Sequence, residues 1–167
     1  SRRQPDRIYS IDAAHGKLWI LVNDEHINFR LAEADPAAPA EWKTVIAGSD
    51  EVYLRGVTPF RDYLVIQERL HGLDQIRLRT YQGEERRIRF PEASYTASLG
   101  SNPEFAPAAY RIGDTSMVTP VSVYDYHPDG DRLEVLKVQE VPSGYDKALY
   151  ETERLMLPTR DGKQVPV

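Results

Sequence analysis

The sequence contains no cysteine in its 167 residues. This absence excludes a disulfide framework, a thiolate zinc site and a cysteine nucleophile. Long apolar runs are missing as well, since the longest, residues 18–22, is far too short to span a membrane. No apolar stretch follows residues 1–3, so no secretory signal peptide is visible there. We therefore expect a cytoplasmic protein without a membrane partner.

An excess of one charge is also lacking. The net charge is only −5, although 28% of the residues are charged, and both signs are mixed along the chain. No basic face for nucleic acid is therefore expected. Apolar residues make up 41%, which is typical of a globular domain, and the length allows a sizeable core. Ten tyrosines and frequent β-branched residues favour strands.

Short alternating segments recur between turn residues, and no segment keeps a helical period. The pattern predicts three sets of four strands. They lie near residues 7–11, 17–23, 27–34 and 42–47; then 52–57, 63–69, 74–80 and 87–90; then 95–99, 110–118, 121–126 and 133–139. The charged run at residues 84–87 is interpreted as a solvated edge that protects an outer strand.

The three sets repeat with a nearly constant period. Leu18 and Leu64 are 46 residues apart, and Ile76 and Val123 are 47 apart. A four-strand unit of about 40–50 residues is typical of a propeller blade. A β-sandwich with evenly spaced strands is the alternative. The period favours an all-β fold, a partial β-propeller of about three four-stranded blades.

Three blades do not close a ring of the usual four to eight. The chain also stops in mid-pattern at residues 165–167. We therefore expect it to be part of a larger protein. Blade faces without neighbours would expose apolar surface, so self-association of the isolated chain is expected.

The C-terminal third carries a family resemblance. Its motifs are Gly144-Tyr145-Asp146, Tyr150-x-x-Glu153-Arg154-Leu155 and Arg160-Asp161-Gly162-x-x-Val165-Pro166. They resemble the propeller-to-hydrolase junction of the oligopeptidase B group in the prolyl oligopeptidase family of serine peptidases. Upstream, Asn102-Pro103-Glu104-Phe105 and the segment at residues 119–126 are similar to the last blades of that group.

Some residues depart from the family pattern. Ser101 and Asp114 stand where bulkier aromatic residues are expected, and Leu157-Pro158-Thr159 replaces a run of small residues. These departures affect the expected local packing and the angle of the junction.

The resemblance implies a seven-bladed propeller that caps an α/β-hydrolase domain. A Ser-Asp-His triad between them would cleave short peptides after Lys or Arg, without a cofactor. Residues 1–142 would hold the last blades of the propeller. Residues 143–167 would hold the junction and the first strands leading into an absent α/β-hydrolase domain. That domain and the remaining blades are the implied partners, and short basic peptides are the implied substrates of the full enzyme.

No catalytic residue is predicted within the chain itself. A serine hydrolase of this class needs Gly-x-Ser-x-Gly, and Ser49, Ser101 and Ser143 each neighbour a glycine without completing that pattern. The four histidines lack metal spacing, and Leu136 stands where a calcium loop beginning at Asp125 needs Glu. We expect no metal and no peptidase activity here, although the parent protein would be an enzyme.

Two groups of residues are candidates for function. The first group would line the central channel, because its members lie on the first strand of a set: Arg55, Thr96 and Ser98. The second would act as a hinge between propeller and hydrolase, with cross-domain ion pairs from its charged members: Tyr145, Tyr150, Glu151, Glu153 and Arg154. A static linker with solvated charges is the alternative for the second group.

The function predicted from these observations is gating. The chain would be a non-catalytic part of a serine oligopeptidase that restricts access to the active site. Two alternatives stay open from the residues alone. One is a stand-alone propeller that binds a protein or a sugar, and the other is a propeller glycosidase that uses two carboxylates as acid and base.

Overall fold

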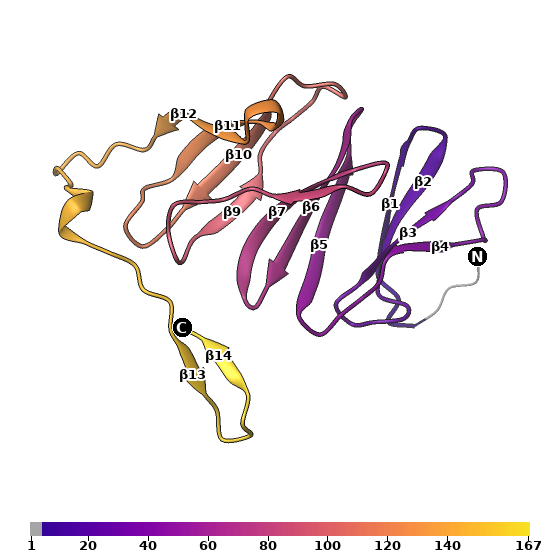
Figure 1. Ribbon diagram of the computed structural model, residues 1–167, viewed down its shortest axis with the longest axis horizontal. Helices are drawn as coiled ribbons and strands as arrows, with labels where there is room; N and C mark the ends of the chain where they lie inside the picture. Colours follow the sequence, from indigo (N-terminus) through magenta and orange to yellow (C-terminus); the bar gives the residue numbers. More distant parts are fainter. Residues whose placement is uncertain (1–4) are drawn as a thin grey trace.

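The computed structural model describes residues 5–167. Three four-stranded antiparallel sheets follow one another along the chain, and a separate hairpin lies at the C-terminal end (Figure 1). The first sheet contains β1 (Tyr9–Ala14), β2 (Lys17–Val22), β3 (Arg30–Ala34) and β4 (Lys43–Ile46). The second contains β5 (Val52–Pro59), β6 (Tyr63–Leu70), β7 (Leu73–Thr80) and β8 (Glu85–Arg87).

The third sheet contains β9 (Thr96–Leu99), β10 (Tyr110–Thr115), β11 (Ser122–His127) and β12 (Arg132–Val138). Every sheet is a meander, in which strands consecutive in sequence pair with each other. Two 3-10 turns, η1 (Pro128–Gly130) and η2 (Lys147–Leu149), precede the hairpin of β13 (Met156–Pro158) and β14 (Gln164–Pro166). The prediction of about three four-stranded blades in an all-β fold is confirmed.

The predicted period is confirmed by equivalent places in successive sheets. Leu18 and Leu64 lie on the second strands, β2 and β6. Ile76 and Val123 lie on the third strands, β7 and β11. One strand was misplaced: β8 lies at Glu85–Arg87, whereas residues 87–90 were predicted. The chain leaves the sheet after the Ile88 amide, which still donates to the Ile76 carbonyl at 2.9 Å.

Two turns with the same sequence connect strands in the first and second sheets. His15 and Gly16 have φ of 54° and 70°, and His71 and Gly72 have φ of 47° and 81°. Two consecutive positive φ values define the type I′ turn, whose twist matches that of the flanking strands. The His-Gly pairs therefore set the register of β1 with β2 and of β6 with β7.

The second sheet is buried on both faces. On β6, Leu64 and Ile66 pack against the first sheet around Trp19, whereas Val65 packs against the third sheet around Ile112. A strand covered on both sides reads as a continuous apolar run rather than as an alternation. The middle blade therefore joins the two others into one array.

Charged residues also lie between the first two sheets. Glu68 has a fully buried side chain, and its two oxygens lie 2.6 Å from Arg77 Nη2 and 2.8 Å from Arg87 Nε. Arg77 in turn contacts Glu85 at 2.8 Å. The interpretation of residues 84–87 as a merely solvated edge is thus incomplete: they occupy the outer strand, but Arg87 binds a buried carboxylate.

The C-terminal third exposes many large apolar side chains. On the outer strand β12 they are Val135, Leu136 and Val138, and on the final hairpin Met156 and Val165. Such surface is the physical reason to expect association with other protein surface. Self-association of the isolated chain stays a prediction.

Candidate functional site

The segment that follows β12 returns beneath the sheets and leads to the final hairpin (Figure 1). Its first regular element is η2, where the Asp146 carboxylate accepts a hydrogen bond of 3.0 Å from the Ala148 amide. The Tyr145 hydroxyl donates to the Val118 carbonyl at 2.6 Å. The rings of Tyr145 and Tyr150 stack with centroids 5.6 Å apart. These contacts fix the start of the junction against the β10–β11 connection.

An ion pair anchors η2 to the third sheet. Lys147 Nζ lies 2.8 Å from Glu92 Oε1 and 2.7 Å from Thr119 Oγ1, and the Thr119 hydroxyl also donates to Glu92. Burial alone would raise the pKa of Glu92, but hydrogen bonds from Lys147, Ser116 and Thr119 outweigh it and lower that pKa. The hydrogen bond with Glu92 raises the pKa of Lys147. Both groups are therefore charged at neutral pH.

A second carboxylate lies close to this pair. Asp114 is 6% exposed on β10, and its Oδ1 atom is buried without a hydrogen-bond partner among the described residues. Burial, together with the nearby charge of Glu92, raises the pKa of Asp114 to about 6. Two carboxyl groups, those of Glu92 and Asp114, thus lie near one ammonium group, that of Lys147. This local imbalance disfavours the ionised form of Asp114.

The C-terminal end of the junction contacts the β6–β7 turn of the second sheet. Arg154 donates a hydrogen bond to the His71 carbonyl in the β6–β7 turn. Next to it, a Cβ atom added to Gly72 would lie 2.6 Å from Pro166 Cγ, closer than real side chains approach. Gly72 is therefore required twice, for its φ of 81° and for the close approach of Pro166.

The hinge candidates divide into two classes in the structure. Tyr145 and Arg154 bond to backbone carbonyls in strand connections of the third and second sheets, and Tyr150 stacks on Tyr145. Glu151 and Glu153 are exposed, and within residues 5–167 no ion pair is formed by either. Whether the segment moves as a hinge stays a prediction.

Sequence reasoning missed the anchor itself. Lys147 lies inside the predicted hinge range but was not selected, and its partner Glu92 is 55 residues away in a loop. No local pattern connects two residues at that separation. The sole available signal was an aspartate at position 114 where the family pattern led us to expect an aromatic residue.

The channel candidates lie where the strand order placed them. Arg55 is on β5, and Thr96 and Ser98 are on β9, which are the first strands of their sheets. All three side chains are exposed. Arg55 binds Asp74 on β7 at 2.9 Å. Their facing toward a channel stays a prediction.

A cavity of about 460 Å³ lies beside the β1–β2 turn of the first sheet and the β5–β6 turn of the second. His15, Trp19 and Tyr81 form an aromatic group there, with His15 and Tyr81 centroids 4.3 Å apart. The Tyr81 hydroxyl donates to the Phe60 carbonyl, and burial raises the pKa of Tyr81 to about 12. Because His15 Nε2 also bonds a backbone carbonyl, that of Arg61, these groups serve packing between blades.

Within residues 5–167, no group of three or more acidic or histidine side chains is placed to hold a metal ion. None of the helical segments described there is long and apolar enough to cross a membrane.

Comparison with known proteins decides the family. A family model described as the N-terminal β-propeller domain of prolyl oligopeptidase matches residues 2–139. The chain belongs to the prolyl oligopeptidase family. The resemblance to this family is thereby confirmed, and the three sheets are blades of its propeller.

Several known proteins are similar to almost the whole chain. Dipeptidyl aminopeptidase BI of Pseudoxanthomonas mexicana is 33% identical over 170 residues, which cover 99% of this chain and 23% of the relative. Protease 2 of Moraxella lacunata is 28% identical over 165 residues, covering 99% and 24%. Oligopeptidase B from Leishmania major has the same fold, with a TM-score of 0.86 and 24% identity over 99% of this chain and 25% of that protein. The chain spans about a quarter of the length of these relatives.

Proposed function

We propose that this chain forms the last blades of a seven-bladed propeller that caps the α/β-hydrolase domain of a cytoplasmic serine oligopeptidase. The observation that carries the proposal is the match of residues 2–139 to the family's N-terminal propeller domain. In this proposal, residues 1–142 belong to the propeller and residues 143–167 lead into the hydrolase. The catalytic triad lies in the hydrolase, since this chain has no Gly-x-Ser-x-Gly.

The propeller would act by restricting access. The first strands of the blades, β1, β5 and β9, would line the central channel, with Arg55, Thr96 and Ser98 among the lining residues. A cap of this kind admits short peptides, excludes folded proteins and removes water from the closed site. The substrates would be peptides cleaved after Lys or Arg, as the oligopeptidase B resemblance implies. A net charge of −5 spread over the chain would attract them only weakly.

The junction would connect the motion of the two domains. Its two ends are held by different blades: Lys147 binds Glu92 beside the third sheet, and Arg154 binds the turn of the second. The residues between them leave Glu151 and Glu153 exposed, where the hydrolase domain can pair with them. The junction would therefore bend between two fixed points.

The hinge is tested by releasing one of these points in the parent enzyme. Lys147→Gln removes the charge-assisted bond to Glu92, which is worth about 1.5–3 kcal/mol. If that bond holds the closed arrangement, the open form should gain roughly tenfold in population, seen as a larger radius of gyration in solution scattering and a lower kcat/KM. The control is Lys163→Gln, because Lys163 is largely exposed and lies 3.9 Å from Asp161. Identical scattering and kinetics for both variants would contradict the hinge.

The absence of catalytic machinery is tested with the chain alone. Incubated with a chromogenic peptide ending in Lys or Arg, the 167-residue chain should release no product, because no triad serine is present in the required motif. Turnover that persists at constant specific activity through successive purification steps would refute this reading.

A further inference from the structure

Two arginines share one buried carboxylate oxygen near the β6–β7 turn of the second sheet. Asp74 is 4% exposed. Its Oδ1 atom lies 2.9 Å from Arg55 Nη1 and 3.0 Å from both Nε and Nη2 of Arg69. The two arginine side chains are themselves 44% and 45% exposed. Two guanidinium groups are thus held side by side at the surface by one buried group.

The strand geometry places these residues together. Arg69 on β6 stands directly opposite Asp74 on β7. Arg55 lies at a β-bulge, where the register of β5 shifts between Leu54 and Gly56 and leaves it without a cross-strand partner. A bulge redirects the side chain of its extra residue. Here it lets Arg55 reach across the sheet to the same oxygen atom that Arg69 binds.

The resulting cluster carries a net positive charge and unused donors. One arginine would suffice to neutralise Asp74, and the second leaves one charge in excess. Each guanidinium offers five N–H donors. Among the described residues, Arg55 donates a side-chain hydrogen bond only through Nη1 and Arg69 only through Nε, while Arg69 Nη2 lies in ion-pair contact with the same Asp74 oxygen. Both side chains are partly exposed and are held in place by Asp74, so little conformational entropy is lost when they bind an anion.

We infer that Arg55 and Arg69 form a binding site for a peptide carboxylate, either a C-terminal carboxylate or an acidic side chain. The planar, forked donors of arginine match a carboxylate in geometry as well as in charge. Tyr53, 39% exposed, stands opposite Arg69 in the β5–β6 register, and its ring packs near Phe29 with centroids 5.9 Å apart. This inference deepens the proposed gating function: the fork would hold the far end of a peptide inside the cap.

The first experiment measures binding directly, without peptidase activity. The 167-residue chain is titrated by calorimetry, at low salt and without phosphate, with N-acetyl-trialanine as the free acid, as the C-terminal amide, and as an amide containing one aspartate. The free acid should bind at least about tenfold more tightly than the plain amide. Equal binding of the aspartate-containing amide would assign the site to any peptide carboxylate, and its failure to bind would assign the site to C-termini. Equal affinity for the acid and the plain amide overturns the inference.

The second experiment assigns binding to the two arginines. R55K/R69K keeps both positive charges beside Asp74, and therefore the fold, but removes the planar forks, so binding of the free acid should weaken about tenfold. R55Q/R69Q should reduce binding of the free acid to the level of the amide. The matched control is R111Q, because Arg111 is also 45% exposed and also paired with an aspartate, Asp125, on the third sheet. An equal loss in R111Q, or no loss in R55K/R69K, overturns the assignment.

These measurements are separable from the test of gating. If the fork fails to bind carboxylates, the kinetics and scattering of the parent enzyme can still support a cap. If gating fails, a carboxylate site on this chain is still measured by titration.

Discussion

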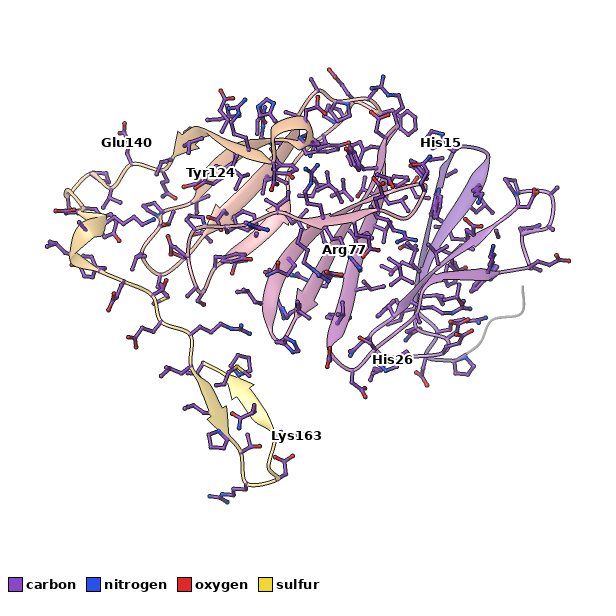
Figure 2. The ribbon with its side chains drawn as sticks, viewed as in Figure 1. His15, His26, Arg77, Tyr124, Glu140 and Lys163 are labelled. Carbon is purple, nitrogen blue, oxygen red and sulfur yellow. The ribbon has the colours of Figure 1, made fainter. Side chains whose placement is uncertain are left out.

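Replacing Glu68 with alanine should destabilise the chain by about 3–5 kcal/mol, which is a large part of the stability of an ordinary domain. Glu68 is fully buried between the first two sheets, 2.6 Å from Arg77, whose side chain is 8% exposed. Arg77 lies within the strands of the middle sheet (Figure 2). Truncating Glu68 would leave Arg77 with only the partly exposed Glu85 as a partner. Removing one partner from a buried ion pair is among the costliest changes in a core.

The effect is measured by urea unfolding of the variant and the parent chain under identical conditions. Glu68→Gln keeps the shape of the side chain and some hydrogen bonds, so its loss should be intermediate. The control is Glu134→Ala, because Glu134 pairs with Arg132 at 2.8 Å on exposed β12, where ion pairs contribute little. If Glu68→Ala unfolds at the same urea concentration as Glu134→Ala, the buried cluster does not stabilise the stacking of the blades.

Replacing Asp114 with asparagine should stabilise the chain by about 3 kcal/mol at pH 7. The pKa of Asp114 is about 6 in the folded state, against 3.8 for the ordinary carboxyl. Above pH 6 the folded chain must therefore hold an ionised carboxylate that burial and Glu92 disfavour. Below pH 3.8 the group is protonated in both states and costs nothing. The penalty thus grows as the pH rises from about 3.8 to about 6 and is then constant.

The pH dependence distinguishes this account from a simple packing effect. The difference in unfolding free energy between Asp114→Asn and the parent chain should be largest at pH 7 and should approach zero near pH 4. Other carboxylates cancel because the two proteins are compared at the same pH. Asp125→Asn is the control, since Asp125 is paired with Arg111 and its replacement should not stabilise. A constant difference across the range, or destabilisation at pH 7, would contradict the prediction.

Much of the fold could be predicted because its signals are local. Alternation, turn residues and a period of 46–47 residues located all three blades, and the His15-Gly16 and His71-Gly72 turns set the hairpins. The error at β8 has a physical cause. Ile88 is buried and still bonded to β7, so the residues following it looked like a continuation of the strand after the chain had already turned away.

The functional contacts could be predicted less well because they join distant residues. The hinge range was located from motifs, but its anchor depends on Glu92, far away in sequence. Asp114 was recognised as unusual in the family pattern, yet its burial depends on how the third sheet packs. Arg55 was selected for its strand, whereas the bulge that turns it toward Asp74 left no mark in the sequence pattern.

The meander arrangement of the sheets has a consequence for cooperativity. Each sheet is made from one continuous stretch of chain and contacts mainly the sheet before and the sheet after it. The array is therefore close to a one-dimensional system, whose stability is a sum of terms for single blades and for nearest-neighbour interfaces. The middle blade contributes to two interfaces and each outer blade to one. Damage to β6 or β7 would uncouple the first blade from the third, whereas loss of an outer blade would leave the other two joined.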